Sequence, residues 1–461
     1  MKHLSALDAL FFHLETPDTP MHVGSVMILE KPRAGRRDAY QRIREHIAGR
    51  LQLAPVFTRK LAPMPLDVVT PAWIRESEVD LDYHVRHLTL RKPGSRAQLE
   101  AAVEKLHEGP LDRSRPLWQF TVIDGLAGGE VAIYAKIHHG ALDGQGGVAV
   151  AQALLDVTRR PRRVDAAAAK TRTPPSALRL LRSAFSHTIS QYGRIVSSLP
   201  ATLQAAARGV AVFAKPGSAA NLLGPATPLN APIGAKRSFV TVRIPLDEAK
   251  AIARYFGVKL NDVVLATCAG ALRGQFARVP GALEKPMIGA VPASLREAGE
   301  TRANAVTMMR VGLATDLARP LERLNAIAAA STRAKAITSG MKDAIPTDLP
   351  SLGLPWLMAA VMPLYRKAAS ADLVPVLANV IISNVPGPPV PLYFAGARLN
   401  AYFPVSIVTH GFGLNITILS YDGSLDYGLL AARDAMPGLR TFARRLRHAH
   451  EELLALVRRG P

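Results

Sequence analysis

Strand-like and helix-like segments alternate along this chain in two runs, and this alternation constrains the fold more than any other feature. The first run has short apolar segments at 21–29, 85–90, 117–125 and 131–138, with helical spacing at 37–51 and 96–106. The second run has apolar segments at 238–245, 286–291, 306–314, 380–383, 414–421 and 425–431, with helical spacing at 246–255, 261–276, 321–337 and 438–459. Mixed periods of this kind are typical of α/β and α+β proteins, so we predict two related α/β domains.

A basic stretch that breaks the alternation separates the two runs. From Arg159 to Lys215 the chain has eleven lysine and arginine residues and one acidic residue, Asp165. This stretch is rich in alanine and proline, as loops and linkers often are. We therefore predict an N-terminal domain, a basic linker and a C-terminal domain over 1–158, 159–235 and 236–461.

Residues 176–198 of this linker place apolar side chains three and four positions apart, which predicts one apolar helical face. Two interpretations remain open. The segment is either a helix packed between two domains or a basic amphipathic helix on a lipid surface. Both are compatible with the arginines that lie off the apolar face.

The overall charge favours anionic partners. The chain has 461 residues and a formal net charge of +21, which suits nucleic acid, anionic lipid or a phosphate-bearing cofactor. No nucleic-acid-binding motif occurs, so we expect no specific nucleic-acid partner. The single cysteine, Cys268, excludes an intramolecular disulfide and favours a reducing compartment. With neither an export signal nor a membrane-spanning run, we predict a cytoplasmic protein, peripheral on the inner membrane face or on lipid inclusions.

The pattern that carries chemistry is VAIYAKIHHGALDGQGG, residues 131–147. A strand-like segment leads directly into His138 and His139, and Asp143 and Gly144 follow at the start of a glycine-rich turn. Imidazole exchanges protons near neutral pH, which suits general acid–base catalysis. A histidine pair by itself is often structural, but the strand, the pair, the Asp-Gly dipeptide and the turn together are more specific. No metal-binding or Walker-type pattern accompanies them, so we predict no metal site.

This segment matches the HHxxxDG signature of the CoA-dependent acyltransferases, the superfamily of chloramphenicol acetyltransferase and of the condensation domains of peptide synthetases. Other segments resemble, in order, motifs of the bacterial wax ester synthase/diacylglycerol acyltransferase family. These segments contain Asp18–Val26; Pro116, Leu117 and Trp118; Asn261 and Asp262; Val291–Arg296; Asn384, Pro386 and Gly387; and Leu414–Thr417. The resemblance implies two chloramphenicol-acetyltransferase-like domains with an active-site tunnel at their interface.

The resemblance also implies a reaction. Acyl-CoA, as co-substrate, donates its acyl chain to a long-chain fatty alcohol or to diacylglycerol, and the product is a wax ester or triacylglycerol. His139 is the implied general base, with no acyl-enzyme and no permanently bound cofactor. His138 is expected to support the loop. Asp143 is expected to be structural and paired with an arginine, for which Arg296 is the candidate.

The other motif residues have a structural and a functional interpretation each. Asn261 and Asn415 are candidate hydrogen-bond donors to the oxyanion of the tetrahedral intermediate. Asn261 also precedes an apolar helical run, as an N-cap residue does. Asn384 is expected either in a rigid turn after a strand or in the wall of a substrate channel. Trp118 is more typical of a core residue than of a substrate contact.

Two alternative functions remain open. A non-catalytic protein would use the same fold and the basic helix at 176–198 to coat a lipid surface. An acyltransferase with a polyketide or carrier-bound acceptor would keep the chemistry and change the substrate. An assay with competing acceptors separates these possibilities.

Overall fold

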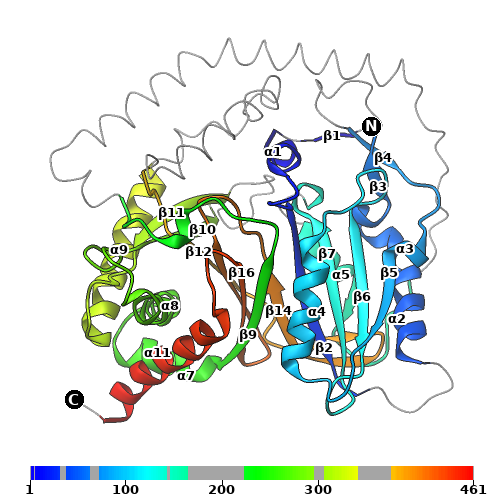
Figure 1. The fold of residues 1–461 in the computed structure, drawn as a ribbon. Helices are drawn as coiled ribbons and strands as arrows, with labels where there is room; N and C mark the ends of the chain where they lie inside the picture. Colours follow the sequence, from blue (N-terminus) through cyan, green and yellow to red (C-terminus); the bar gives the residue numbers. More distant parts are fainter. Residues whose placement is uncertain are drawn as a thin grey trace. The chain divides into compact units, whose positions relative to one another are not determined.

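A computed structural model describes residues 2–4, 6–31, 38–62, 72–142, 146–164, 223–294, 306–340 and 375–459. These residues belong to two compact units (Figure 1). The first unit contains the described residues up to 164 and, in addition, 390–402. The second contains the other described residues from 223 onward.

The first unit is built on a seven-stranded sheet in the order β5-β6-β7-β2-β14-β13-β8. The strands are β2 (His22–Leu29), β5 (Val85–Thr89), β6 (Trp118–Asp124), β7 (Val131–His138), β8 (Leu155–Asp156), β13 (Tyr393–Phe394) and β14 (Ala397–Val405). A three-stranded sheet has the order β1-β4-β3, with β1 (Lys2–His3), β3 (Arg59–Leu61) and β4 (Ala72–Arg75). The helices are α1 (Ala6–Leu14), α2 (Ala39–Ala48), α3 (Leu81–His84), α4 (Arg96–Glu108), α5 (Gly146–Leu154) and the short turns η1 (Leu51–Leu53), η2 (Pro55–Phe57) and η3 (His139–Ala141).

Strand β7 is the best-buried strand of this sheet, and it ends at the histidine pair. It lies between β2 and β6, antiparallel to both, and all of its residues are buried. The charged residue among them is Lys136, whose Nζ donates to the carbonyls of Leu106 and Gly109 at the end of α4. A cation at a helix C-terminus interacts favourably with the helix dipole. This contact ties α4 to the strand, so β7 is held from the helix side as well as within the sheet.

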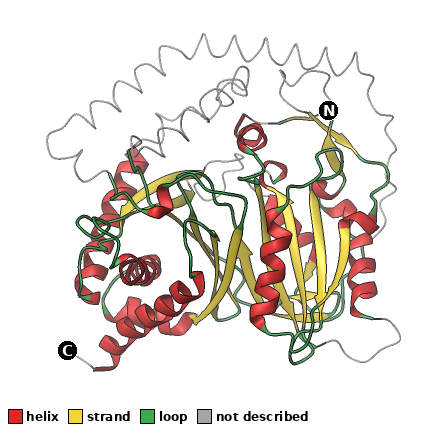
Figure 2. Ribbon diagram, viewed as in Figure 1, coloured by secondary structure: helices red, strands yellow, loops and turns green. Residues whose placement is uncertain are grey.

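The second unit has a six-stranded sheet in the order β11-β10-β12-β15-β16-β9. The strands are β9 (Arg237–Pro245), β10 (Ile288–Ser294), β11 (Val306–Gly312), β12 (Val380–Val385), β15 (Leu414–Tyr421) and β16 (Ser424–Ala432). The helices are α7 (Leu246–Tyr255), α8 (Leu260–Phe276), α9 (Pro320–Gly340) and α11 (Leu439–Arg459), preceded by the short turn η5 (Pro228–Asn230). The four long helices lie on one side of the sheet (Figure 2), and the apolar core of the unit fills the space between the two layers.

The structure confirms the α/β character and the strand into the histidine pair, and it differs from the sequence analysis at several places. Strand β12 continues to Val385, so Asn384 lies on a strand and the predicted turn begins after it. Residues 390–402 belong to the first unit, because β13 pairs with β8 and with β14 in its sheet. The greater part of the predicted linker, including the helix at 176–198, lies outside the described residues. Among the described residues, no helix combines the length and the apolar character needed to cross a bilayer.

Candidate active site

The backbone of the histidine pair is held by hydrogen bonds on both sides. The His138 N–H donates to the Leu117 carbonyl at 2.9 Å, and the His139 N–H donates to the Met21 carbonyl at 2.8 Å. Leu117 belongs to the Pro-Leu-Trp motif, and Met21 lies in the Asp18–Val26 motif. Two of the sequence motifs therefore meet the pair through main-chain groups.

His138 is fully buried, and both of its ring nitrogens face protein groups. Its Nδ1 accepts a hydrogen bond from the Gly140 N–H at 3.1 Å, and its Nε2 lies 3.5 Å from Oε1 of Glu15. Because 3.5 Å is long for a hydrogen bond, the second contact is chiefly electrostatic. The ring of Phe12 stacks on the imidazole with centroids 4.1 Å apart. Burial lowers the pKa of His138, with Glu15 acting in the opposite direction, so the ring is neutral at neutral pH.

His139 is more open than its neighbour, and its ring is neutral too. Burial, followed by the effect of His138, lowers its pKa from 6.5 to about 4, and its own backbone carbonyl acts against this shift. Its Nδ1 is buried without a hydrogen-bond partner of good geometry among the described residues. No described residue forms a hydrogen bond with its Nε2. An uncharged imidazole with a nitrogen that has no hydrogen-bond partner among the described residues can take up a proton from a bound substrate.

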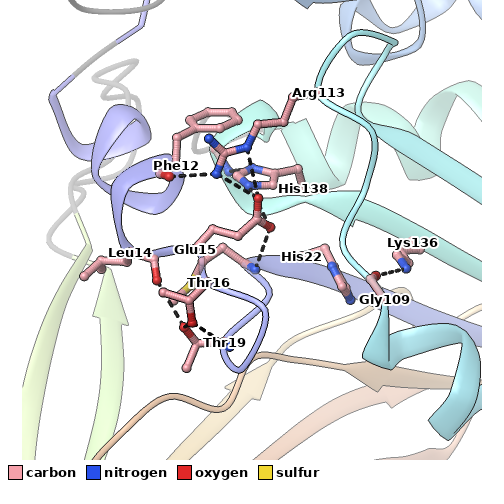
Figure 3. A network of polar contacts seen from close by, with 12 residues as sticks. Phe12, Leu14, Glu15, Thr16, Thr19, His22, Gly109, Arg113, Lys136 and His138 are labelled. Atoms are coloured by element: carbon pink, nitrogen blue, oxygen red, sulfur yellow. Dashed lines mark hydrogen bonds and ion pairs between the residues drawn. The ribbon is translucent and has the colours of Figure 1, made fainter. Parts of the chain in front are cut away.

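A buried carboxylate, that of Glu15, lies beside His138 (Figure 3). Oε1 of Glu15 accepts from the Met21 N–H at 3.1 Å, and Oε2 accepts from Nε and Nη2 of Arg113 at 3.1 and 2.8 Å. Burial by itself raises the pKa of Glu15, but His138, the Met21 N–H and Arg113 outweigh it and lower the pKa to about 2. Glu15 is therefore ionised throughout the neutral range.

The sequence analysis missed Glu15, Arg113 and the aromatic residues of α1. The available signal was one acidic residue, Glu15, between the apolar segment of α1 and the turn-forming sequence Thr-Pro-Asp-Thr. The turn is closed by Thr19, whose hydroxyl donates to the Leu14 carbonyl at 3.1 Å (Figure 3). Contacts with Arg113 and His138, about a hundred positions away, are tertiary and leave no local pattern.

The other predicted site residues of the first unit are either buried or outside the described residues. Leu117 and Trp118 are completely buried, and Nε1 of Trp118 donates to the Phe57 carbonyl at 3.1 Å, which confirms the interpretation of Trp118 as a core residue. Asp143 and Gly144 lie outside the described residues, as does Arg296 in the second unit. The pairing of Asp143 with Arg296 therefore stays a prediction.

In the second unit, two predicted motif residues meet. Nδ2 of Asn384 on β12 donates to Oδ1 of Asn261 on α8 at 3.3 Å. The expectation that Asn261 is an N-cap is wrong, because the helix begins one residue earlier and Lys259 is the capping position. The Lys259 N–H donates to Oδ2 of Asp262 at 3.1 Å, which gives Asp262 the role of stabilising this helix end.

The two other polar motifs of this unit are held by local hydrogen bonds. Nδ2 of Asn415 donates to the Ile407 carbonyl at 3.0 Å, and its Oδ1 accepts from Thr417 at 2.8 Å. The Gly387 N–H, next to Pro386, donates to the hydroxyl of Ser420 at 3.0 Å. A side chain at position 387 would collide with the Ser420 carbonyl, which accounts for the glycine.

Neither a metal site nor a reactive thiol is seen in the described part of the chain. The described residues contain no group of three or more histidine, cysteine or acidic side chains that could hold a metal ion. Cys268 is completely buried, and its burial raises the pKa of the thiol to about 12. A thiolate nucleophile at this position is therefore absent at neutral pH.

Comparison with known proteins shows which family the chain matches. The family model for the wax ester synthase/diacylglycerol acyltransferase catalytic domain matches residues 4–264, and the model for the C-terminal domain of the same family matches 303–454. A putative diacylglycerol O-acyltransferase of Mycobacterium bovis is 35% identical over 99% of this chain and 92% of its own length. A probable diacylglycerol O-acyltransferase of Mycobacterium tuberculosis is 31% identical over 97% of each chain.

Solved structures agree with the sequence relatives. The wax ester synthase/diacylglycerol acyltransferase of Marinobacter aquaeolei VT8 superposes with a TM-score of 0.72 at 26% identity, over 99% of this chain and all of that chain. A starter condensation domain of rhizomide synthetase, in complex with C8-CoA, superposes with a TM-score of 0.57 at 15% identity over 99% and 95% of the two chains, which shows a shared fold. The chain belongs to the wax ester synthase/diacylglycerol acyltransferase family and is an O-acyltransferase.

Proposed function

We propose that the enzyme esterifies a long-chain alcohol or diacylglycerol with the acyl chain of acyl-CoA, and that His139 is the general base. The observation that carries this proposal is the state of His139, a neutral imidazole at the end of β7 whose Nε2 has no partner among the described residues. A base of this kind has to be uncharged and open on one nitrogen when the substrate binds.

In the proposed reaction, one proton moves from the acceptor hydroxyl to His139 and then to the CoA thiolate. Nε2 of His139 takes the proton of the acceptor hydroxyl while the hydroxyl oxygen attacks the thioester carbonyl. The tetrahedral intermediate then collapses, the carbon–sulfur bond breaks, and the CoA thiolate receives the proton from the imidazolium. The low pKa of about 4 favours the second transfer, because a buried imidazolium readily gives up its proton.

The acyl group passes directly between the substrates in this scheme. The chain has one cysteine, and its thiol is buried with a pKa of about 12. A cysteine-linked acyl intermediate is therefore not part of the proposal. The acceptor hydroxyl is the nucleophile, and acyl-CoA serves as co-substrate with no resident cofactor.

Peripheral association with a lipid surface is a second, separable part of the proposal. Long-chain alcohols and diacylglycerol partition into lipid phases, and the net charge of +21 suits an anionic surface. The exposed basic residues Arg160 and Arg163, at the start of the basic stretch, have no ion-pair partner among the described residues. They lie at the start of the predicted basic linker, whose helix at 176–198 is outside the described residues.

The assay uses purified protein with palmitoyl-CoA and, in parallel, hexadecanol and diacylglycerol. CoA thiol release and thin-layer separation of products are measured. We expect His139→Ala to lower kcat by roughly 10²–10⁴-fold. The matched control is His448→Ala, which removes a histidine that is 73% exposed on α11. Ester formation that persists in His139→Ala contradicts the role of His139, and a preference for carrier-bound acceptors contradicts the substrate class.

A further inference from the structure

We infer that Glu15 is a positioning residue for the catalytic histidine, acting through His138 on the turn that carries His139. Glu15 touches neither His139 nor the reacting atoms in the proposed reaction, so its role is indirect. The kinetic consequence rests on the proposed function, whereas the hydrogen-bond arrangement does not.

The neutral ring of His138 carries its proton on Nε2. The Gly140 N–H can only donate, so Nδ1 of His138, 3.1 Å away, must offer a lone pair. The single proton of the neutral ring is therefore on Nε2, which faces Oε1 of Glu15 at 3.5 Å. The other tautomer would direct N–H against N–H at Gly140 and a lone pair against the carboxylate. The carboxylate thus selects the tautomer that can hold Gly140.

The Nε2–H tautomer of His138 lets its Nδ1 hold the Gly140 N–H. Gly140 is the residue after His139, and both belong to the short turn η3. The hydrogen bond from the Gly140 N–H to Nδ1 of His138 folds this turn back onto the strand end. A shift of the His138 ring would move the peptide between His139 and Gly140, and with it the direction of the His139 side chain.

Met21 links Glu15 to His139 through its main-chain groups. Its N–H donates to Oε1 of Glu15 at 3.1 Å, and its carbonyl accepts from the His139 N–H at 2.8 Å. One peptide segment therefore connects the carboxylate to His139 on one side, while His138 and Gly140 connect them on the other. A side chain held from both directions can be placed to within the tolerance that catalysis needs.

The Glu15 carboxylate is buried and directed at His138. The Glu15 side chain is 5% exposed, whereas its partner Arg113 is 45% exposed. Arg113 adds to the contacts of His138 and Met21 that lower the pKa of Glu15, and Oε1 lies 3.5 Å from Nε2 of His138 (Figure 3). Nη2 of Arg113 also donates to the Phe12 carbonyl at 2.8 Å, which fixes the end of α1 that supports the pair.

The experiment is a double-mutant cycle with Glu15→Leu and His138→Asn. Glu15→Leu removes the acceptor, and we expect kcat to fall roughly 10–100-fold with little change in the KM for acyl-CoA. Glu15→Gln keeps an acceptor of the same shape and is expected to recover most of the loss. In His138→Asn, the amide oxygen of the shorter side chain can still accept from Gly140 but the side chain does not reach Glu15, so adding Glu15→Leu to this variant should cost less than about twofold. Equal losses from Glu15→Leu in both backgrounds overturn the inference.

A second readout depends neither on activity nor on the folding of any variant at position 15. In a ¹⁵N-histidine spectrum of the wild-type protein, with the His138 signal assigned from its loss in His138→Asn, we expect a neutral ring protonated at Nε2 near pH 7. A proton on Nδ1 overturns the inference. If the wild-type protein makes no ester but shows the Nε2–H tautomer, the proposed function fails and the positioning arrangement stands.

Discussion

Phe11 stacks on the ring of His139, with centroids 3.9 Å apart and an angle of 23° between the planes. The aromatic ring covers one face of the imidazole and excludes water from it. Burial of the ring, to which Phe11 contributes, is the largest cause of the low pKa of His139. Helix α1, which contributes no catalytic group, thereby helps to keep the proposed base neutral.

Phe11→Ala is expected to raise the pKa of His139 from about 4 toward 6.5 by admitting water. The base works only when neutral, so activity is lost as the pH falls below this pKa. The acid limb of the pH profile of kcat/KM should move to higher pH in the variant. Tyr255→Ala, which removes an exposed aromatic residue from the second unit, should leave the limb in place. A limb that is unchanged in Phe11→Ala contradicts this cause of the shift.

Glu15→Gln should reduce stability in a pH-dependent manner. The pKa of Glu15 is lowered from 4.5 to about 2, so its ionised form contributes stability that is present above pH 4.5 and lost as the pH falls toward 2. Urea unfolding of the wild type and the variant should differ most at pH 7 and less at pH 3. Glu284→Gln, at an exposed glutamate, is the control, and a difference between wild type and Glu15→Gln that grows at low pH contradicts the prediction.

Gly140→Ala tests how tightly η3 is held against α1. A Cβ at position 140 would lie 2.5 Å from a ring carbon of Phe12 and 2.7 Å from the Asp8 carbonyl, so the turn must shift. Overpacking of this kind costs about 1–3 kcal/mol, and we expect kcat to fall with it. Gly312→Ala, on β11 of the second unit, is the control, because a Cβ there meets nothing within 4 Å. Thermal unfolding and initial rates check both variants, and equal behaviour of the two argues against a tight turn.

Replacing Arg160 and Arg163 together by alanine should weaken binding to vesicles of phosphatidylcholine with phosphatidylglycerol, more so at low salt. Two neighbouring arginines are unsuitable for this test because they have structural partners. Arg159 pairs with Glu30, and Arg162 donates to the Ala153 carbonyl at 3.1 Å.

The control for the vesicle experiment removes the same charge elsewhere. Arg278 and Lys285 are exposed in the second unit, and their double alanine variant should bind vesicles as the wild type does. Sedimentation with vesicles, with and without added salt, measures the difference. If both double variants lose binding equally, net charge and not this segment accounts for the association.

The strand and the histidine pair were predictable because their signal is local. Eight residues of strand character lead up to and include His138, and a strand buried on both faces requires such a run. Trp118 was predictable for a similar reason, since a residue of that size is usually buried. The start of α8 was not, because Lys259 has none of the side chains that normally mark an N-cap, and the expected position moved to Asn261.

The support of the pair was beyond the reach of the sequence. Glu15 contacts Arg113 and His138, which are 98 and 123 positions away, and a single acidic residue beside a turn does not indicate such partners. The place of residues 390–402 in the first unit was missed because they join a sheet whose other strands come from the first part of the chain. Periodicity detects an element, but it does not tell which layer the element joins.

The double role of Met21 has a consequence for mutational scanning. Both of its links run through peptide groups, so exchanging its thioether for another residue leaves them in place. Any defect from alanine at this position would be ascribed to lost packing, since the side chain is buried. Only a change to the main chain itself, such as an ester in place of the amide or a proline that lacks the N–H hydrogen, would remove the Met21 hydrogen bond to Glu15 and reveal its effect on His139.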